Sequence, residues 1–288
     1  MKKFIAILAI LVALCLAAAG CAAPAAEAAA PAGEEPPVEE AAPAEEAAEQ
    51  VELIVFAAAS LQETLTQIGE LYQAVAPNVT LIFSFDSSGT LKTQIQEGAD
   101  CDLFISAAQK QMNQLDAAAD PEVNTEGLDF VEQGTRVDLL ENKVALVVPE
   151  GNPANINSFA DIANCKSIAL GNDDVPVGQY SIEILTNLGL LEGLESGSKI
   201  TYGSNVKEVT TQVSEGAVDC GIVYATDAFS AGLTIVDQAQ EDMCSQVIYP
   251  AAVLNISQHL EEAKAFLAYL QGEEATAVFE SVGFAPVG

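Results

Sequence analysis

From residue 51 onward, short β-branched runs alternate with amphipathic stretches, and this alternation limits the possible folds more than any other feature. The amphipathic stretches place apolar residues at i, i+3, i+4 and i+7, the spacing of a helix with one buried face. Strand, helix and strand in repetition predict an α/β fold, with parallel sheets and helices on both faces. We expect strands at 51–57, 79–85, 102–106, 143–148, 167–171, 199–203 and 220–224, and helices at 61–75, 90–97, 179–188, 205–213 and 259–272.

The charge balance and residue content exclude several functions. The chain has 42 Asp and Glu against 10 Lys and Arg, a net charge of −32, and no basic cluster beyond Lys2-Lys3. Nucleic acid and anionic membrane surfaces would therefore be repelled. His259 is the single histidine of the sequence, so multi-histidine metal sites lack their ligands. Gly-x-Ser-x-Gly, Walker and Gly-x-Gly-x-x-Gly motifs are also missing from the sequence, and we expect no enzyme activity.

The first fifty residues have the composition of a targeting segment and a tether. A positive start, an apolar run over 4–19 and Ala18-Ala19-Gly20-Cys21 resemble the signal and lipobox of bacterial lipoproteins. This resemblance implies that residues 1–20 are cleaved off and that Cys21 carries a lipid anchor. Because Ala18 replaces the usual Leu, a plain secretory signal is the alternative. Residues 22–50 hold 13 Ala, 8 Glu and 5 Pro, too little bulky apolar surface for a core. We expect an exported protein on the extracytoplasmic face of the cell membrane, in the periplasm or cell-wall space.

Two strand ends in the first half bring serines to expected helix starts. The first strand leads into Ser60-Leu61-Gln62-Glu63, which has the pattern of a capping box, and the second leads into Ser87-Ser88-Gly89-Thr90. Each junction offers backbone N–H groups, the positive end of a helix dipole and a hydroxyl, which together can bind an anion without formal charge. Serine is also a common helix cap, so each junction alone is weak evidence. Ligands of parallel sheets bind beyond the carboxyl ends of the strands, which makes both junctions candidates.

Six motifs follow one another along residues 51–288. They are VFAAASL at 55–61, SSGTL at 87–91, DLFISA at 102–107 followed by Gln109-Lys110, VPVGQY at 175–180, Asn205-Val206, and GIVYATDA at 221–228. In this order they resemble the periplasmic molybdate-binding proteins, the substrate-binding subunits of molybdate ABC transporters. The resemblance implies a two-lobed periplasmic-binding-protein-like fold of type II, each lobe a mostly parallel sheet flanked by helices, with a hinge between them. It also implies a monomer without cofactor that captures molybdate or tungstate for a permease and an ATPase.

The resemblance further implies which groups hold the oxyanion. Ser60 and Ser88 would donate from the first lobe through hydroxyls and backbone N–H groups. The second lobe would contribute the backbone N–H groups of Val177 and Val206 and the hydroxyl of Tyr224. No metal cation is expected beside the oxyanion. The first four of these residues each stand near the start of an expected helix, which agrees with the anion site inferred from the residues alone.

Asp86 departs from the family pattern, which commonly has Ala or Gly there. A carboxylate facing the cleft could accept a hydrogen bond from a protonated anion, whereas one that caps locally would face solvent. A binding protein of the same fold for sulfate or a phosphorylated metabolite is therefore the alternative. A cationic side chain in the cleft would favour the phosphorylated metabolite, and the nearest candidates are Lys92, Lys207 and Arg136.

The resemblance implies two discontinuous lobes. We expect residues 51–134 and 247–288 in the first lobe and 135–246 in the second, with pivots near 134–143 and 247–252. Four cysteines follow Cys21: Cys101, Cys165, Cys220 and Cys244. An exported protein can form disulfides, but buried free thiols fit the sequence as well. Cys165 and Cys220 both precede expected strands of the second lobe, which makes them the best candidates for a pair.

Overall fold

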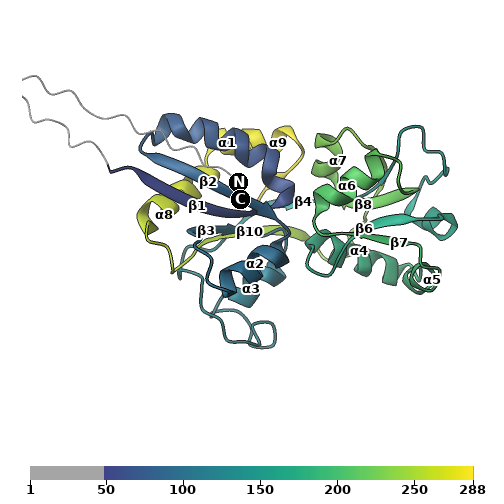
Figure 1. Ribbon diagram of the computed structural model, residues 1–288, viewed down its shortest axis with the longest axis horizontal. Coiled ribbons are helices and arrows are strands. Elements are labelled where there is room, and N and C mark those ends of the chain that lie inside the picture. The colour runs from purple at the N-terminus through teal and green to yellow at the C-terminus, as the bar shows by residue number, and fades with distance from the viewer. Residues whose placement is uncertain (1–48, 288) are drawn as a thin grey trace, which may run out of the picture. The chain divides into compact units, whose positions relative to one another are not determined.

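The computed structural model describes residues 49–287 (Figure 1). The expected signal at 1–20, the anchor Cys21 and nearly all of the tether lie outside the described residues. Among the described helices, none combines the length and the apolar character needed to cross a membrane. The described part holds two separate sheets, one of six strands and one of five.

The first sheet has the strand order β11-β4-β10-β3-β1-β2. β1 pairs in parallel with β2 and β3, whereas β10 runs antiparallel to β3 and β4. The parallel pairing follows from the strand, helix, strand order of the sequence. The strands are β1 (Val51–Ala58), β2 (Val79–Asp86), β3 (Leu103–Ile105), β4 (Val137–Asn142), β10 (Val247–Val253) and β11 (Ala285–Pro286).

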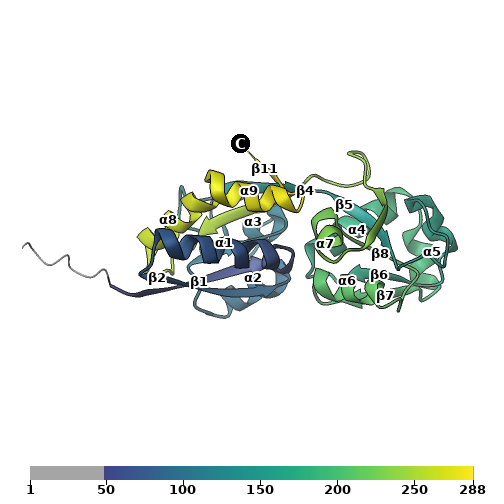
Figure 2. The same ribbon diagram turned by 90° about the horizontal axis from the view of Figure 1, so that it is seen from above.

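Helices cover both faces of this sheet (Figure 2). Successive side chains of a strand point to opposite faces, so Leu53 and Val55 of β1 join one core while Phe56 joins another. The first core is closed by α1, α8 and α9, and the second by α2 and α3. We call this sheet and its helices the first lobe: α1 (Gln62–Val75), α2 (Ser88–Gln96), α3 (Gln109–Leu115), α8 (Leu260–Leu270), α9 (Glu273–Ser281) and the 3-10 turn η1 (Ala59–Leu61).

The second sheet has the order β7-β6-β8-β5-β9. β6 pairs in parallel with β7 and β8, and β5 runs antiparallel to β8 and β9. We call this sheet and its helices the second lobe. Its strands are β5 (Val144–Val148), β6 (Ile168–Gly171), β7 (Ile200–Gly203), β8 (Cys220–Tyr224) and β9 (Thr234–Gln238), and its helices are η2 (Phe159–Asn164), α4 (Pro176–Asn187), α5 (Leu191–Ser196), α6 (Val206–Ser214) and α7 (Ala225–Ser230).

The predicted α/β class is confirmed, and the seven predicted strands are present with small shifts at their ends. Neither sheet is mostly parallel as expected, because β4, β10 and β11 in the first sheet and β5 and β9 in the second pair antiparallel. The lobe boundary differs from the expectation of 134/135. β4 pairs with β10 and β11 in the first sheet, so the first lobe extends to Asn142. The chain then enters the second lobe at Lys143 and returns through 239–246. Hydrogen bonding of β4 to strands more than a hundred residues away sets this boundary, which local composition does not reveal.

The four cysteines among the described residues are free thiols. Cys165 and Cys220 are neighbours, but both are free thiols, so the expected pair forms no disulfide here. The Lys166 N–H donates to the Asp219 carboxylate at 2.6 Å, which holds the two segments together. Contact with Cys165 and burial raise the pKa of the Cys220 thiol, whereas contact with Cys220 lowers the pKa of Cys165.

Candidate functional site

A small cavity lies where the strand ends of the first lobe face the helix starts of the second lobe. Its volume is about 10 Å³, room for roughly one water molecule. The strands β1 and β2 and the loop after β3 reach it from the first lobe, and α4, α6 and β8 reach it from the second. This is the carboxyl edge at which parallel sheets bind ligands. The lining residues are Ala58, Ala59, Ser60, Asp86, Ser87, Ser88, Ala107, Val175, Pro176, Val206 and Tyr224.

Four of the five predicted anion-binding residues line this cavity: Ser60, Ser88, Val206 and Tyr224. Val177 is fully buried and follows two lining residues, Val175 and Pro176. A larger hollow of about 520 Å³ lies at the crossings between the lobes, along 141–144 and 238–247. It is bordered by none of the predicted residues, so the smaller cavity is the candidate site.

Ser60 lies in the 3-10 turn η1 between β1 and α1, and the predicted capping box is wrong. Helix α1 begins at Gln62, and neither η1 nor α1 has a side-chain cap. The Ser60 hydroxyl instead lies 2.9 Å from the Tyr249 hydroxyl of β10. The long-range partner removes Ser60 from local capping and leaves its hydroxyl at the cavity.

Ser88 is the first residue of α2, and its neighbour Ser87 is the cap. The Ser87 hydroxyl accepts from the Thr90 N–H at 3.1 Å. The Ser88 hydroxyl accepts from the Ala107 N–H at 2.9 Å and is fully buried. A hydroxyl that accepts still keeps its own proton, so Ser88 can donate into the cavity. Ser88 is therefore a prearranged donor.

The second lobe presents two helix starts. Helix α4 begins with Pro176, which has no N–H, so Val177 carries its first amide proton. Helix α6 is capped by Asn205, whose side chain accepts from the Glu208 N–H at 3.1 Å, while the amide of Val206 is left for another partner. Both helices direct the positive ends of their dipoles toward an anion placed there. These donors belong to the backbone, so side-chain identity matters little for them.

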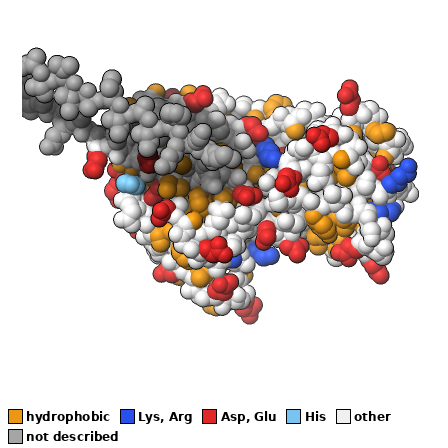
Figure 3. Space-filling model, viewed as in Figure 1, with side chains coloured by type: hydrophobic (Ala, Val, Ile, Leu, Met, Phe, Trp, Pro, Cys, Tyr) orange, Lys and Arg blue, Asp and Glu red, His pale blue; other side chains and the backbone are white. Residues whose placement is uncertain are grey.

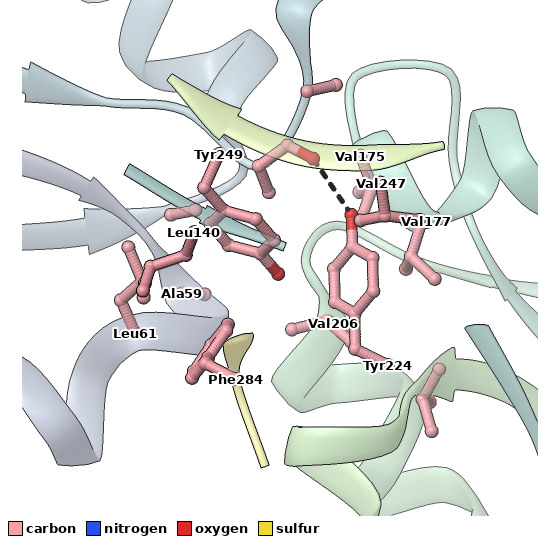
Figure 4. Close-up of a cluster of buried hydrophobic side chains, with 14 of the residues drawn as sticks. Ala59, Leu61, Leu140, Val175, Val177, Val206, Tyr224, Val247, Tyr249 and Phe284 are labelled. Atoms are coloured by element: carbon pink, nitrogen blue, oxygen red, sulfur yellow. Dashed lines mark hydrogen bonds between the residues drawn. The ribbon is translucent and has the colours of Figure 1, made fainter. Parts of the chain in front are cut away.

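Tyr224 ends β8 and is nearly fully buried. Its hydroxyl donates to the Ala107 carbonyl at 3.3 Å, the contact drawn as a dashed line in Figure 4. Burial raises the pKa of Tyr224 well above its usual value, so the phenol remains a proton donor. Its bond to Ala107 is long, and an anion oxygen in the cavity would compete for the proton.

Asp86 was expected either to face the cleft or to cap locally. It lies in the cavity wall and also makes a local contact. One carboxylate oxygen accepts from the Ser87 N–H at 2.7 Å. The same oxygen lies 3.5 Å from the Asn205 side-chain nitrogen of the second lobe. Asp86 is half-buried, and neither of these contacts engages its second carboxylate oxygen.

None of the three candidate cations lines the cavity. Arg136 donates to Asp116 at 2.8 Å, on the first lobe. Lys207 lies 2.7 Å from Glu63 of the first lobe and 3.0 Å from Asp227 of its own lobe. Burial raises the pKa of Asp227 to about 6, although the Lys207 ammonium opposes the shift. The cavity wall thus holds neutral donors and one carboxylate.

Comparisons with known proteins identify the family of the chain. A family model for bacterial extracellular solute-binding proteins matches residues 53–285. YvgL of Bacillus subtilis (strain 168), assigned by name to the ABC transporter substrate-binding lipoproteins, is 37% identical over 238 residues, 82% of this chain and 87% of YvgL. The molybdate-binding protein ModA of Escherichia coli (strain K12) is 32% identical over 244 residues, 82% of this chain and 90% of ModA.

A solved structure supports the fold independently. The periplasmic molybdate-binding protein of Azotobacter vinelandii superimposes with a TM-score of 0.70 at 22% identity, covering 82% of this chain and all of that one. The family model spans nearly all of both lobes, and two relatives above 30% identity cover most of the chain. The protein therefore belongs to the bacterial extracellular solute-binding proteins.

Proposed function

We propose that this protein captures molybdate between its two lobes with neutral hydrogen-bond donors and delivers it to the permease and ATPase of an ABC importer. The observation that carries the proposal is the interlobe cavity, whose wall offers hydroxyls and a helix-start amide and holds no Lys, Arg or His. The relatives named as molybdate-binding proteins supply the identity of the anion.

The charge of the protein makes local donors necessary. Residues 51–288 carry 34 acidic and eight basic residues, so long-range attraction cannot gather a dianion. Figure 3 shows Asp and Glu side chains scattered over the visible face with few Lys or Arg between them. Hydrogen bonds to a charged group contribute about 1.5–3 kcal/mol each, and several in an enclosed cavity can offset the desolvation of a dianion.

Selectivity would follow from the donors and from cavity size. Molybdate and tungstate are fully deprotonated near neutral pH and larger than sulfate, so a donor cage sized for them holds sulfate loosely. We propose that tungstate binds as well, because its size and charge nearly match those of molybdate. No cofactor or cation takes part.

Asp86 supports a second candidate, a protonated oxyanion such as phosphate. Its carboxylate belongs to the cavity wall and could accept the proton of such an anion. The bond to the Ser87 N–H and the proximity to Asn205 engage one of its oxygens and favour the first candidate.

The setting of the protein is also part of the proposal. The lipobox-like sequence ending at Cys21 and the tether to residue 50 would hold a monomer at the extracytoplasmic face of the membrane, by the lipid alone. The name of YvgL, a substrate-binding lipoprotein, supports this arrangement. The motifs of common enzymes are missing from the sequence, and we propose a transport role without catalysis.

Titration calorimetry with molybdate, tungstate, sulfate and phosphate tests the proposal. We expect tight binding of the first two, much weaker binding of sulfate and no measurable binding of phosphate. Preference for phosphate would show that Asp86 acts on the ligand and would replace molybdate with the second candidate. No binding of any of the four anions would overturn the proposal.

A further inference from the structure

We infer that Tyr249 is a positioning residue of this site: together with Asn142 it turns the Ser60 hydroxyl so that its proton points into the cavity. The inference rests on the proposed function, since it assigns a direction to one of the proposed donors. Tyr249 lies on β10, 189 residues from Ser60 along the chain. In Figure 4 its ring extends between Ala59 of η1 and Val206 of α6.

The direction of the Ser60 proton depends first on Asn142, the last residue of β4. Its side-chain oxygen accepts from the Lys143 N–H at 2.8 Å. The side-chain nitrogen must therefore face the other way, where it donates to the Thr226 hydroxyl at 2.8 Å and to the Tyr249 hydroxyl at 3.2 Å. A backbone N–H thus fixes which end of the amide meets Tyr249.

The orientation of the Asn142 amide determines in which direction the Tyr249 hydroxyl donates. Its hydroxyl oxygen accepts from Asn142, so its own proton is left for the Ser60 hydroxyl at 2.9 Å. Tyr249 is fully buried, and burial raises its pKa well above the usual value, which keeps the phenol protonated. A tyrosine in this position can therefore act as a permanent donor to Ser60.

Ser60 is the end of the chain of hydrogen bonds. Its oxygen accepts from Tyr249, and its own proton remains for an acceptor in the cavity that it lines. An oxyanion offers only acceptors, so a serine that pointed a lone pair inward would repel it. Donation from Tyr249 also polarises the Ser60 hydroxyl and strengthens the bond that Ser60 makes.

The start of this chain lies where the lobes meet. Asn142 directly precedes the crossing at Lys143, and its second partner, Thr226, belongs to α7 of the second lobe. Contact between the lobes therefore helps to hold the amide that orients Tyr249. Three buried polar side chains, Asn142, Tyr249 and Ser60, therefore connect the lobe crossing at Lys143 to the cavity.

The ring of Tyr249 also packs in the core, so the test must keep it. Its centroid lies 5.3 Å from that of Phe284 and 5.7 Å from that of Tyr224. Tyr249→Phe removes only the hydroxyl. Tyr180→Phe is the matched control, because Tyr180 is a buried tyrosine of the second lobe whose ring also contacts Tyr224, at 6.4 Å.

The experiment is a double-mutant cycle on molybdate affinity with Ser60→Ala, Tyr249→Phe and the double variant of the full-length protein. We expect Tyr249→Phe to weaken binding roughly two- to tenfold and Tyr180→Phe to change it less than about twofold. In the Ser60→Ala background the effect of Tyr249→Phe should vanish, because no hydroxyl remains to be oriented.

Three outcomes would overturn the inference while leaving molybdate binding intact: an unchanged affinity in Tyr249→Phe, an unchanged affinity in Ser60→Ala, or the same loss from Tyr249→Phe in both backgrounds. The last result would mark Tyr249 as a structural residue only. If the unaltered protein binds none of the four anions tested above, the proposed function and this inference fall together.

Discussion

The two lobes place hydrogen-bond donors at the same cavity by different means. The first lobe uses side-chain hydroxyls, Ser60 and Ser88, each held by a partner distant in sequence. The second lobe uses mainly helix starts, where Val177 and Val206 offer backbone amides, with Tyr224 as its one hydroxyl. In the proposed site, side-chain chemistry would therefore control the first half and backbone geometry the second. Substitutions in the two lobes should therefore differ in effect.

Among the substitutions considered, Gly89→Ala should cause the largest loss of molybdate affinity, because the added Cβ would keep the lobes apart. The Gly89 N–H donates to the Asp174 carbonyl of the second lobe at 2.9 Å. A Cβ on Gly89 would lie 2.5 Å from that oxygen and 2.8 Å from the Asp174 Cα, distances that real structures avoid. Loss of the second-lobe donors predicts a fall in molybdate affinity of more than about 100-fold, measured by calorimetry.

Gly193→Ala is the matched control, since a Cβ at that helical position meets no atom within 4 Å. Its affinity should equal that of the unaltered protein. Full affinity in Gly89→Ala would mean that the lobes need not approach this closely when the anion binds.

Ser88→Ala tests the side-chain half of the comparison. It removes a buried hydroxyl held by the Ala107 N–H and leaves the backbone of α2 unchanged. Loss of one hydrogen bond to a charged ligand, about 1.5–3 kcal/mol, predicts a roughly 10- to 100-fold weaker affinity for molybdate. Ser214→Ala, on the exposed end of α6, serves as control. A loss no greater than that of the control would remove Ser88 from the site.

Glu63 and Lys207 form an ion pair between the lobes, beside the cavity but outside its wall. Glu63 is half exposed, so Glu63→Gln should weaken molybdate binding only about two- to fivefold, and mainly through faster dissociation measured by stopped flow. Glu63→Lys should have a larger effect, because it places two cations together. Glu70→Gln and Glu70→Lys, on the exposed face of the same helix, should leave the dissociation rate unchanged. Equal molybdate dissociation rates in the Glu63 and Glu70 variants would show that the Glu63–Lys207 ion pair does not contribute to binding.

Val206→Ala should have the smallest effect on binding, since the donor proposed there is the amide. We expect an affinity within about twofold of the original, although loss of buried apolar surface should lower the free energy of unfolding by roughly 1–3 kcal/mol. Chemical denaturation and calorimetry on the same sample separate the two effects. A tenfold loss of affinity with unchanged stability would show that the side chain, and not the amide, makes the contact.

The sequence predicted the features that depend on local pattern. Seven of the eleven described strands follow from apolar periodicity, and α6 was predicted at 205–213 and runs from Val206 to Ser214. The strand ends that carry Ser60 and Ser88 were predicted from local pattern, whereas Val177, Val206 and Tyr224 were assigned by the family resemblance.

Features set by distant contacts were missed. The capping box at Ser60 was a wrong prediction, because its hydroxyl pairs with Tyr249, 189 residues away. β4 was assigned to the wrong lobe, because its pairing with β10 has no local signature. The ion pair of Glu63 with Lys207 joins residues 144 positions apart, which no spacing rule connects.

The salt dependence of molybdate binding tests the central claim most directly, that neutral donors rather than charge hold the anion. Calorimetry over about a tenfold range of NaCl concentration would compare the affinities. The cavity wall, which holds no cationic side chain, and the acidic surface predict an affinity that stays constant or rises slightly as salt screens repulsion. A steep fall of affinity with added salt would contradict the account and would mean that a cationic side chain binds the anion.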